Sequence, residues 1–95
     1  MSTRGTIATR IEAKLRGEFS PVALTVEDES ARHAGHAGAR EGGESHFRVR
    51  IVSEKFHGLT RVERQRLVYA VLADEIAGGV HALALTTLTP EEAQP

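Results

Sequence analysis

The fold of this chain is decided by residues 45–51, which read SHFRVRI. Apolar Phe47, Val49 and Ile51 alternate with polar residues, and successive side chains of a β-strand point to opposite faces of a sheet. The stretch therefore predicts a strand that is covered by a core on one face and open to solvent on the other.

Two further stretches alternate in the same way. They are residues 22–27 and residues 80–88, the latter around Leu83 and Leu85. We expect the first to pair antiparallel with residues 45–51 and the second to complete a three-stranded mixed sheet. The open face of this sheet is expected to carry Thr25, Glu27, His46, Arg48, Arg50, Ala84 and Thr86.

Helices are predicted before the first strand and before the last. The first is amphipathic, since apolar residues recur every four positions at Ile7, Ile11, Leu15 and Phe19. The second begins at Arg61, because Thr60 and Glu63 fit a capping box, and it ends at residues 78–79; a break near Ala73 is left open. Its expected core residues are Val62, Leu67, Val68, Val71, Leu72 and Ile76, and its expected outward residues are Arg61, Glu63, Arg64 and Arg66.

The order of these elements indicates an α+β fold with helices on one face of the sheet. We expect a single domain over residues 1–95, with an ordered core at about residues 6–89. The polar, glycine-rich segment at about residues 29–43 is predicted to be a mobile loop, and residues 90–95 a mobile tail.

Composition excludes several functional classes. Twelve Lys and Arg against 13 Asp and Glu leave a net charge of −1, so any basic surface must be a local patch. The chain has no cysteine, which leaves imidazole and carboxylate as metal ligands. No long apolar run or leader is recognisable, so we expect a soluble protein without membrane contact, in the bacterial cytoplasm or in the mitochondrial matrix or another organelle of a eukaryote.

Histidines carry the main functional signal. His33 and His36 lie in the predicted loop, and His81 opens the third strand, which that loop can reach. Imidazoles that meet at a sheet edge suit a borderline metal ion or an iron of an iron–sulfur cluster. Solvated loop histidines explain the same pattern, and a zinc hydrolase is disfavoured because nothing fixes a general base.

Nucleic-acid binding and catalysis have weaker signals. Residues 35–38 match the G-x-x-G clamp of KH modules, but that clamp joins two helices, whereas here the match lies between strands. Arginines on the open sheet face and the second helix could contact phosphates, and a solvated, salt-bridged face explains them equally. No catalytic triad, P-loop or dinucleotide fingerprint is identifiable, so an enzyme is the poorer hypothesis.

Several spaced motifs resemble the BolA family. They run from Ile7 to Glu91 and include Asp28-Glu29-Ser30, His33, Glu44-Ser45-His46-Phe47, Ile51-Val52-Ser53, Phe56-x-Gly58, Arg64-Gln65-Arg66-Leu67-Val68-Tyr69 and Val80-His81-Ala82-Leu83. The resemblance implies a class II KH-like fold with the order α-β-β-α-(α)-β, in agreement with the elements expected from the residues.

The resemblance also implies a non-enzymatic accessory protein. Such a protein pairs with a monothiol CGFS glutaredoxin and shares a bridging [2Fe–2S] cluster with it and with glutathione, so that the isolated chain carries no cluster. The family's C-terminal histidine ligand falls on His81 and its loop ligand on His33. This sequence departs from the family pattern at His36, within an enlarged loop, so His36 stays an alternative to the preferred His33.

Some members of the BolA family are described as DNA-binding transcriptional regulators. In this sequence the corresponding surface would include Lys55, Arg61, Arg64 and Arg66. DNA binding is therefore the alternative function, and a weak homodimer of the isolated chain is left open.

Overall fold

The computed structural model describes residues 6–29 and 46–94. Its elements are α1 (Thr6–Phe19), β1 (Ala23–Asp28), β2 (His46–Val52), η2 (Glu54–Phe56), α2 (Arg61–Val71), α3 (Ala73–Ala77), β3 (Ala82–Leu88) and α4 (Pro90–Ala93). This order confirms the α+β fold expected from the sequence. In the described part of the chain no helix is long and apolar enough to cross a membrane.

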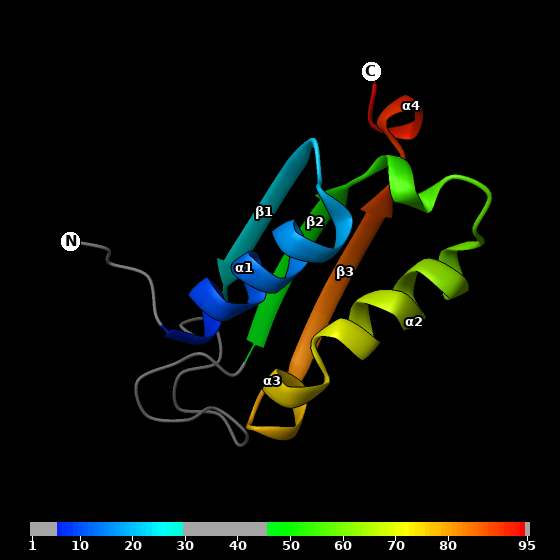
Figure 1. Ribbon diagram of the computed structural model, residues 1–95. Coiled ribbons are helices and arrows are strands. Elements are labelled where there is room, and N and C mark those ends of the chain that lie inside the picture. Colours follow the sequence, from blue (N-terminus) through cyan, green and yellow to red (C-terminus); the bar gives the residue numbers. More distant parts are fainter. Residues whose placement is uncertain (1–5, 30–45, 95) are drawn as a thin grey trace.

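The three strands form one mixed sheet in the order β1-β2-β3. β1 pairs antiparallel with β2, with Val26 opposite Val49, and β3 pairs parallel with β2, with Ala82 opposite His46. α1 and α2 cover one face of this sheet, α3 lies near the start of β3, and α4 lies beyond its end (Figure 1). The predicted mixed sheet is confirmed, and its parallel pair brings the starts of β2 and β3 to the same end.

The core lies between the helices and the covered face of the sheet. α1 contributes Ala8, Ile11, Leu15 and Phe19, and the remaining buried apolar residues of the cluster are Phe47, Val49, Ile51, Phe56, Val68, Leu72 and Val80. The rings of Phe19 and Phe56 are tilted by 41°, with centroids 5.2 Å apart. On the opposite face Arg48 and Arg50 are exposed, as the alternating pattern predicts.

Two residues of α2 that were predicted to be core are not. Val62 is 54% exposed and Leu67 is 44% exposed, whereas Val68 and Leu72 are fully buried. The spacing of apolar residues in a helix does not by itself say how wide a stripe of its surface the neighbouring elements cover. Here the covered stripe is narrow, so the expectation was wrong for Val62 and Leu67.

The predicted second helix is two helices. Its expected start is confirmed, since Thr60 and Glu63 form both bonds of the capping box. α2 ends at Val71, and α3 follows after Leu72, whose N–H still bonds to the carbonyl of Val68 at 3.0 Å. Gly79 then turns the chain with φ of 132°, a region that L residues with a side chain rarely adopt.

The expected mobile tail is wrong at its start, because residues 90–93 form α4. Thr89 caps this short helix, and the side chain of Glu92 reaches back to the Thr89 N–H at 2.8 Å. Pro90 opens the helix, a position where a missing N–H costs nothing. The sequence therefore contained the capping box of Thr89 and Glu92, which was overlooked because it lies near the C-terminus.

Candidate functional site

His46 and His81 lie together at one end of the sheet. His46 is the first residue of β2, and His81 directly precedes β3; the parallel pairing sets His46 opposite Ala82. Their ring centroids are 6.2 Å apart, and the ring planes are inclined by 34°. His81 is exposed and His46 is half-buried. This pair is the candidate site.

The backbone that carries His81 is held by α3 and, through α3, by α1. Val80, the residue before His81, is buried, and its N–H donates to the carbonyl of Glu75 at 3.3 Å. The Glu75 carboxylate is buried as well, with Lys14 Nζ at 2.9 Å and Arg10 Nη2 at 3.0 Å. The contacts of α3 with α1 therefore help to fix the backbone position of His81.

The structure describes only one of the three predicted metal ligands. His81 is at the sheet end, as expected, while His33 and His36 lie outside the described residues, so their pairing with His81 stays a prediction. The residue that the structure places beside His81 is His46, which the alternating pattern had assigned to the open sheet face. The parallel pairing implied by a mixed sheet was the signal that could have found it.

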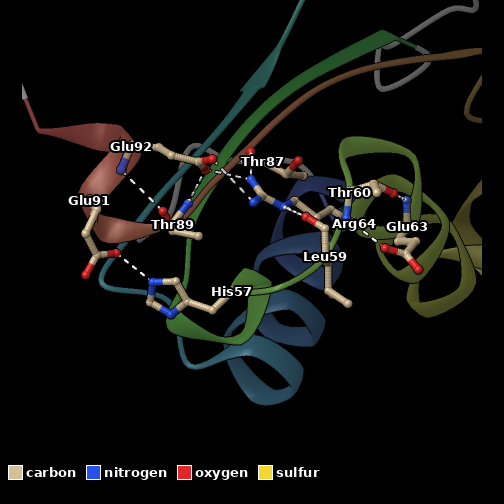
Figure 2. A network of polar contacts seen from close by, with 9 residues as sticks. All are labelled: His57, Leu59, Thr60, Glu63, Arg64, Thr87, Thr89, Glu91 and Glu92. Atoms are coloured by element: carbon tan, nitrogen blue, oxygen red, sulfur yellow. Dashed lines mark hydrogen bonds and ion pairs between the residues drawn. The ribbon is translucent and has the colours of Figure 1, made fainter.

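Arg64, predicted to point outward, is instead half-buried and joins α2 to the C-terminal segment. Its side chain is 11% exposed and lies over the ring of Phe56, 5.9 Å from the centroid. It donates to the carbonyls of Leu59 and Thr87 at 3.0 and 3.2 Å, and to Glu92 Oε1 at 2.6 Å (Figure 2). The expectation failed because Glu92 and α4 were assigned to a tail.

The Arg64 guanidinium, through its hydrogen bond, holds the pKa of Glu92 at about 2, with help from the backbone of Thr89. The ion pair between Arg64 and Glu92 is therefore formed across the physiological range. Of the other predicted phosphate-binding residues, Lys55 donates to the carbonyl of Glu18 at 2.9 Å. Arg61 and Arg66 are exposed. Lys55, Arg61 and Arg66 therefore stay exposed cations, whereas the charge of Arg64 is paired with Glu92.

A second polar cluster, at the opposite end of the sheet, was not anticipated. His57 Nε2 lies 2.6 Å from Glu91 Oε1, and His57 Nδ1 lies 4.0 Å from Glu54 Oε1 (Figure 2 shows the contact with Glu91). Within residues 6–29 and 46–94 these three side chains form the one group of three or more whose ligand atoms lie within 4.8 Å of one another. All three are exposed, and the hydrogen bond accounts for their proximity, so we assign them to holding α4.

We predict a pH dependence for this attachment of α4. The hydrogen bond to Glu91 raises the pKa of His57 above 6.5, and the same bond lowers the pKa of Glu91 below 4.5. The contribution of His57 is therefore complete below pH 6.5 and lost as pH rises through its raised pKa. That of Glu91 is complete above pH 4.5 and lost as pH falls through its lowered pKa. The attachment is expected to be tightest between these limits.

Amide chemical shifts of Glu91 and Ala93 along a pH series measure this attachment. The alkaline transition should vanish in His57→Gln, while the acidic one, which includes Glu92, should remain. An alkaline transition of unchanged size in His57→Gln would contradict the assignment.

The architecture defines a small α+β protein whose candidate ligand atoms are imidazoles at one sheet end. A model of the family described as BolA-like protein matches residues 15–92. The chain therefore belongs to the BolA-like family, as the motifs in the sequence indicated. The match covers the end of α1, the three strands, α2 and α3, together with both histidines of the site.

Relatives of known sequence and structure support this family assignment. The chain is 50% identical over 86 residues to the DNA-binding transcriptional regulator BolA of Escherichia coli K12, covering 90% of this chain and 78% of that protein. It is 48% identical over 92 residues to the chloroplastic/mitochondrial SufE-like protein 1 of Arabidopsis thaliana, covering 93% of this chain but only 25% of that protein. The solved BolA domain of SufE1 from Arabidopsis thaliana superposes with a TM-score of 0.86 at 46% identity, over 96% of this chain and 100% of that one.

Proposed function

We propose that this chain is a non-enzymatic accessory protein that binds a monothiol CGFS glutaredoxin and shares a bridging [2Fe–2S] cluster with it and with glutathione. Its role would lie in the assembly or trafficking of iron–sulfur clusters or in iron sensing. The observation that carries the proposal is His81, an exposed imidazole at a sheet end beside a second imidazole.

The donor set fits an iron of such a cluster. With no cysteine in the chain, only imidazole and carboxylate groups are available, and imidazole suits iron. Two histidines in place of two cysteines on one iron also occur in Rieske centres, where they raise the reduction potential. His81 would supply one nitrogen, and His33 or His36 is the loop ligand expected from the sequence. Exposure of His81 leaves it accessible to a partner protein.

The test is anaerobic co-purification of the chain with a CGFS glutaredoxin and glutathione, followed by visible circular dichroism of the cluster. We expect a heterodimer whose spectrum differs from that of the glutaredoxin homodimer. His81→Ala should abolish this difference, because one iron loses its imidazole ligand. His57→Ala is the matched control, since His57 lies in the separate cluster with Glu91, and it should leave the spectrum unchanged. A spectrum of the complex that is unaltered by His81→Ala would refute the role of His81.

DNA binding is the second candidate function. A relative that is 50% identical is named as a DNA-binding transcriptional regulator, and Arg61 and Arg66 are exposed on α2. Arg64 is less suited to contact a phosphate, because its guanidinium is held by Glu92. If the chain binds DNA, the logarithm of its DNA affinity should fall linearly with the logarithm of the salt concentration. The slope should become smaller in Arg61→Ala but not in Arg50→Ala, since Arg50 lies on the open sheet face.

A further inference from the structure

We propose that the outer edge of β3, together with α2, binds an extended segment of a partner protein. The segment pairs antiparallel with β3 and directs an acidic side chain toward Arg61. The surface between β3 and the start of α2 is called the β3–α2 groove below. It does not include the histidine pair, and its role does not depend on the function proposed above.

The outer edge of β3 has its own set of backbone groups. β3 is the last strand of the sheet, so only one of its sides is paired (Figure 1). The Ser53 N–H donates to the carbonyl of Leu88 at 2.9 Å, which shows that the backbone groups of Leu88 point toward β2. Because successive residues of a strand direct these groups to alternate sides, those of Leu83, Leu85 and Thr87 point to the outer edge.

Side chains of α2 bind two of these outward carbonyls. Tyr69 Oη donates to the carbonyl of Leu83 at 3.2 Å, and Arg64 Nη1 donates to that of Thr87 at 3.2 Å. Leu85 lies between them, and in the part of the chain that the structure describes its outward N–H and C=O have no partner. In an antiparallel pair one residue can exchange both hydrogen bonds with the residue opposite. One residue of an added strand can therefore satisfy Leu85.

The space beside Leu85 is open to such a strand. A cavity of about 140 Å³ is lined by Arg61, Gln65, Leu85, Thr86, Thr87 and Leu88. A wider cavity of about 410 Å³ shares Arg61, Thr87 and Leu88 with it. Leu85 packs against the core on the face that α2 covers, and residues directly opposite each other in a sheet point to the same face. The residue paired with Leu85 would therefore direct its side chain between Arg61 and Gln65.

Arg61 determines which side chain fits there. Its guanidinium is exposed, and within residues 6–29 and 46–94 no carboxylate pairs with it. The other cation of the groove, Arg64, is paired with Glu92 at 2.6 Å, so the residues that line the two cavities carry one net positive charge. An aspartate or glutamate complements this charge. A second copy of the chain does not, because pairing of two β3 edges would bring two Arg61 side chains together.

The test is a titration of the full chain with a probe peptide, followed by amide NMR. The probe is the acetylated and amidated peptide Thr-Val-Thr-Glu-Thr-Val-Thr, whose Val and Glu side chains share one face of a strand. We expect the amide signals of Leu85 and Thr87 to shift. A probe with Gln in place of Glu should bind about 2-fold to 5-fold more weakly, as for a solvent-exposed ion pair. Arg61→Gln should abolish this difference, and Arg50→Gln, on the open sheet face, should preserve it.

Methylation of the peptide backbone tests the strand pairing separately. A methyl group on the Glu nitrogen removes the N–H that the carbonyl of Leu85 would accept, and it should weaken binding about 5-fold or more. A methyl group on the nitrogen of the next residue is the matched control. That N–H points away from β3, so this peptide should bind nearly as well as the unmodified probe.

Three results would overturn the proposal. The first is that the amide signals of Leu85 and Thr87 do not shift at millimolar peptide, or that both methylated peptides bind equally well. The second is that these signals shift with the concentration of the chain alone, since a second copy is then the occupant. The third is that single-stranded oligothymidylate shifts them and the peptide does not, since the groove is then a nucleic-acid site.

Discussion

Replacing Phe56 by alanine is expected to lower the free energy of unfolding by about 3–5 kcal/mol, the usual cost of truncating a buried phenylalanine. Phe56 is fully buried, packs against Phe19 at a centroid distance of 5.2 Å, and lies beneath the Arg64 guanidinium. The substitution therefore leaves a cavity where η2, α1 and the α2–α4 link meet, and no single element can move to fill it.

Urea denaturation followed by far-UV circular dichroism measures this loss. Phe56→Leu, which keeps most of the volume, should cost much less than Phe56→Ala. Val62→Ala is the exposed control, because Val62 is 54% exposed, and it should change stability by no more than about 0.5 kcal/mol. A loss below about 1 kcal/mol for Phe56→Ala would mean that the core collapses around the site and that the packing described is not the one that stabilises the fold.

Replacing Glu75 by glutamine is expected to cost about 1.5–3 kcal/mol, the range for hydrogen bonds to charged groups. The Glu75 side chain is 1% exposed; it accepts a hydrogen bond from Lys14 Nζ at 2.9 Å and forms an ion pair with Arg10 Nη2 at 3.0 Å, so it joins α3 to α1. Glutamine keeps the shape but removes the negative charge, leaving an amide against two cations. The loss stays below that for Phe56 because Arg10 and Lys14 are partly exposed and can turn to water.

Asp74→Asn is the matched control for Glu75→Gln. Asp74 is the neighbouring carboxylate and lies 3.7 Å from the same Lys14 Nζ, but its side chain is 84% exposed. Its replacement should cost well below 1 kcal/mol, as for exposed ion pairs. If denaturation experiments show that both variants lose the same free energy of unfolding, the burial of Glu75 does not contribute to stability. The expected larger loss would identify Glu75 as the anchor of α3 and hence of the turn that carries His81.

Local patterns were sufficient for most of the scaffold. The alternation of Phe47, Val49 and Ile51 identified β2 and its buried face, and the capping box at Thr60 placed the start of α2 correctly. These signals are local because side-chain direction in a strand, and cap bonding in a helix, depend on near neighbours in sequence. The resemblance to the BolA family came from the same stretches, and the family match confirms it.

Long-range contacts account for what the sequence did not reveal about the site. Two predictions were wrong for the same reason: that Arg64 points outward, and that a mobile tail begins at residue 90. Both overlooked the pairing of Arg64 with Glu92, which joins α2 to α4. His46 was placed on the correct strand but not beside His81, because that proximity needs the parallel register of β2 and β3. No spacing in the chain shows a contact of this kind directly.

The sequence by itself determined the class of fold and the family. It could do so because burial patterns and motifs are properties of the chain before it folds. The tertiary structure decided which side chains meet: His46 with His81 at one end of the sheet, and Arg64 and His57 with α4 at the other. The physical reason is that strand register and helix docking bring together residues far apart in sequence only after the core has formed.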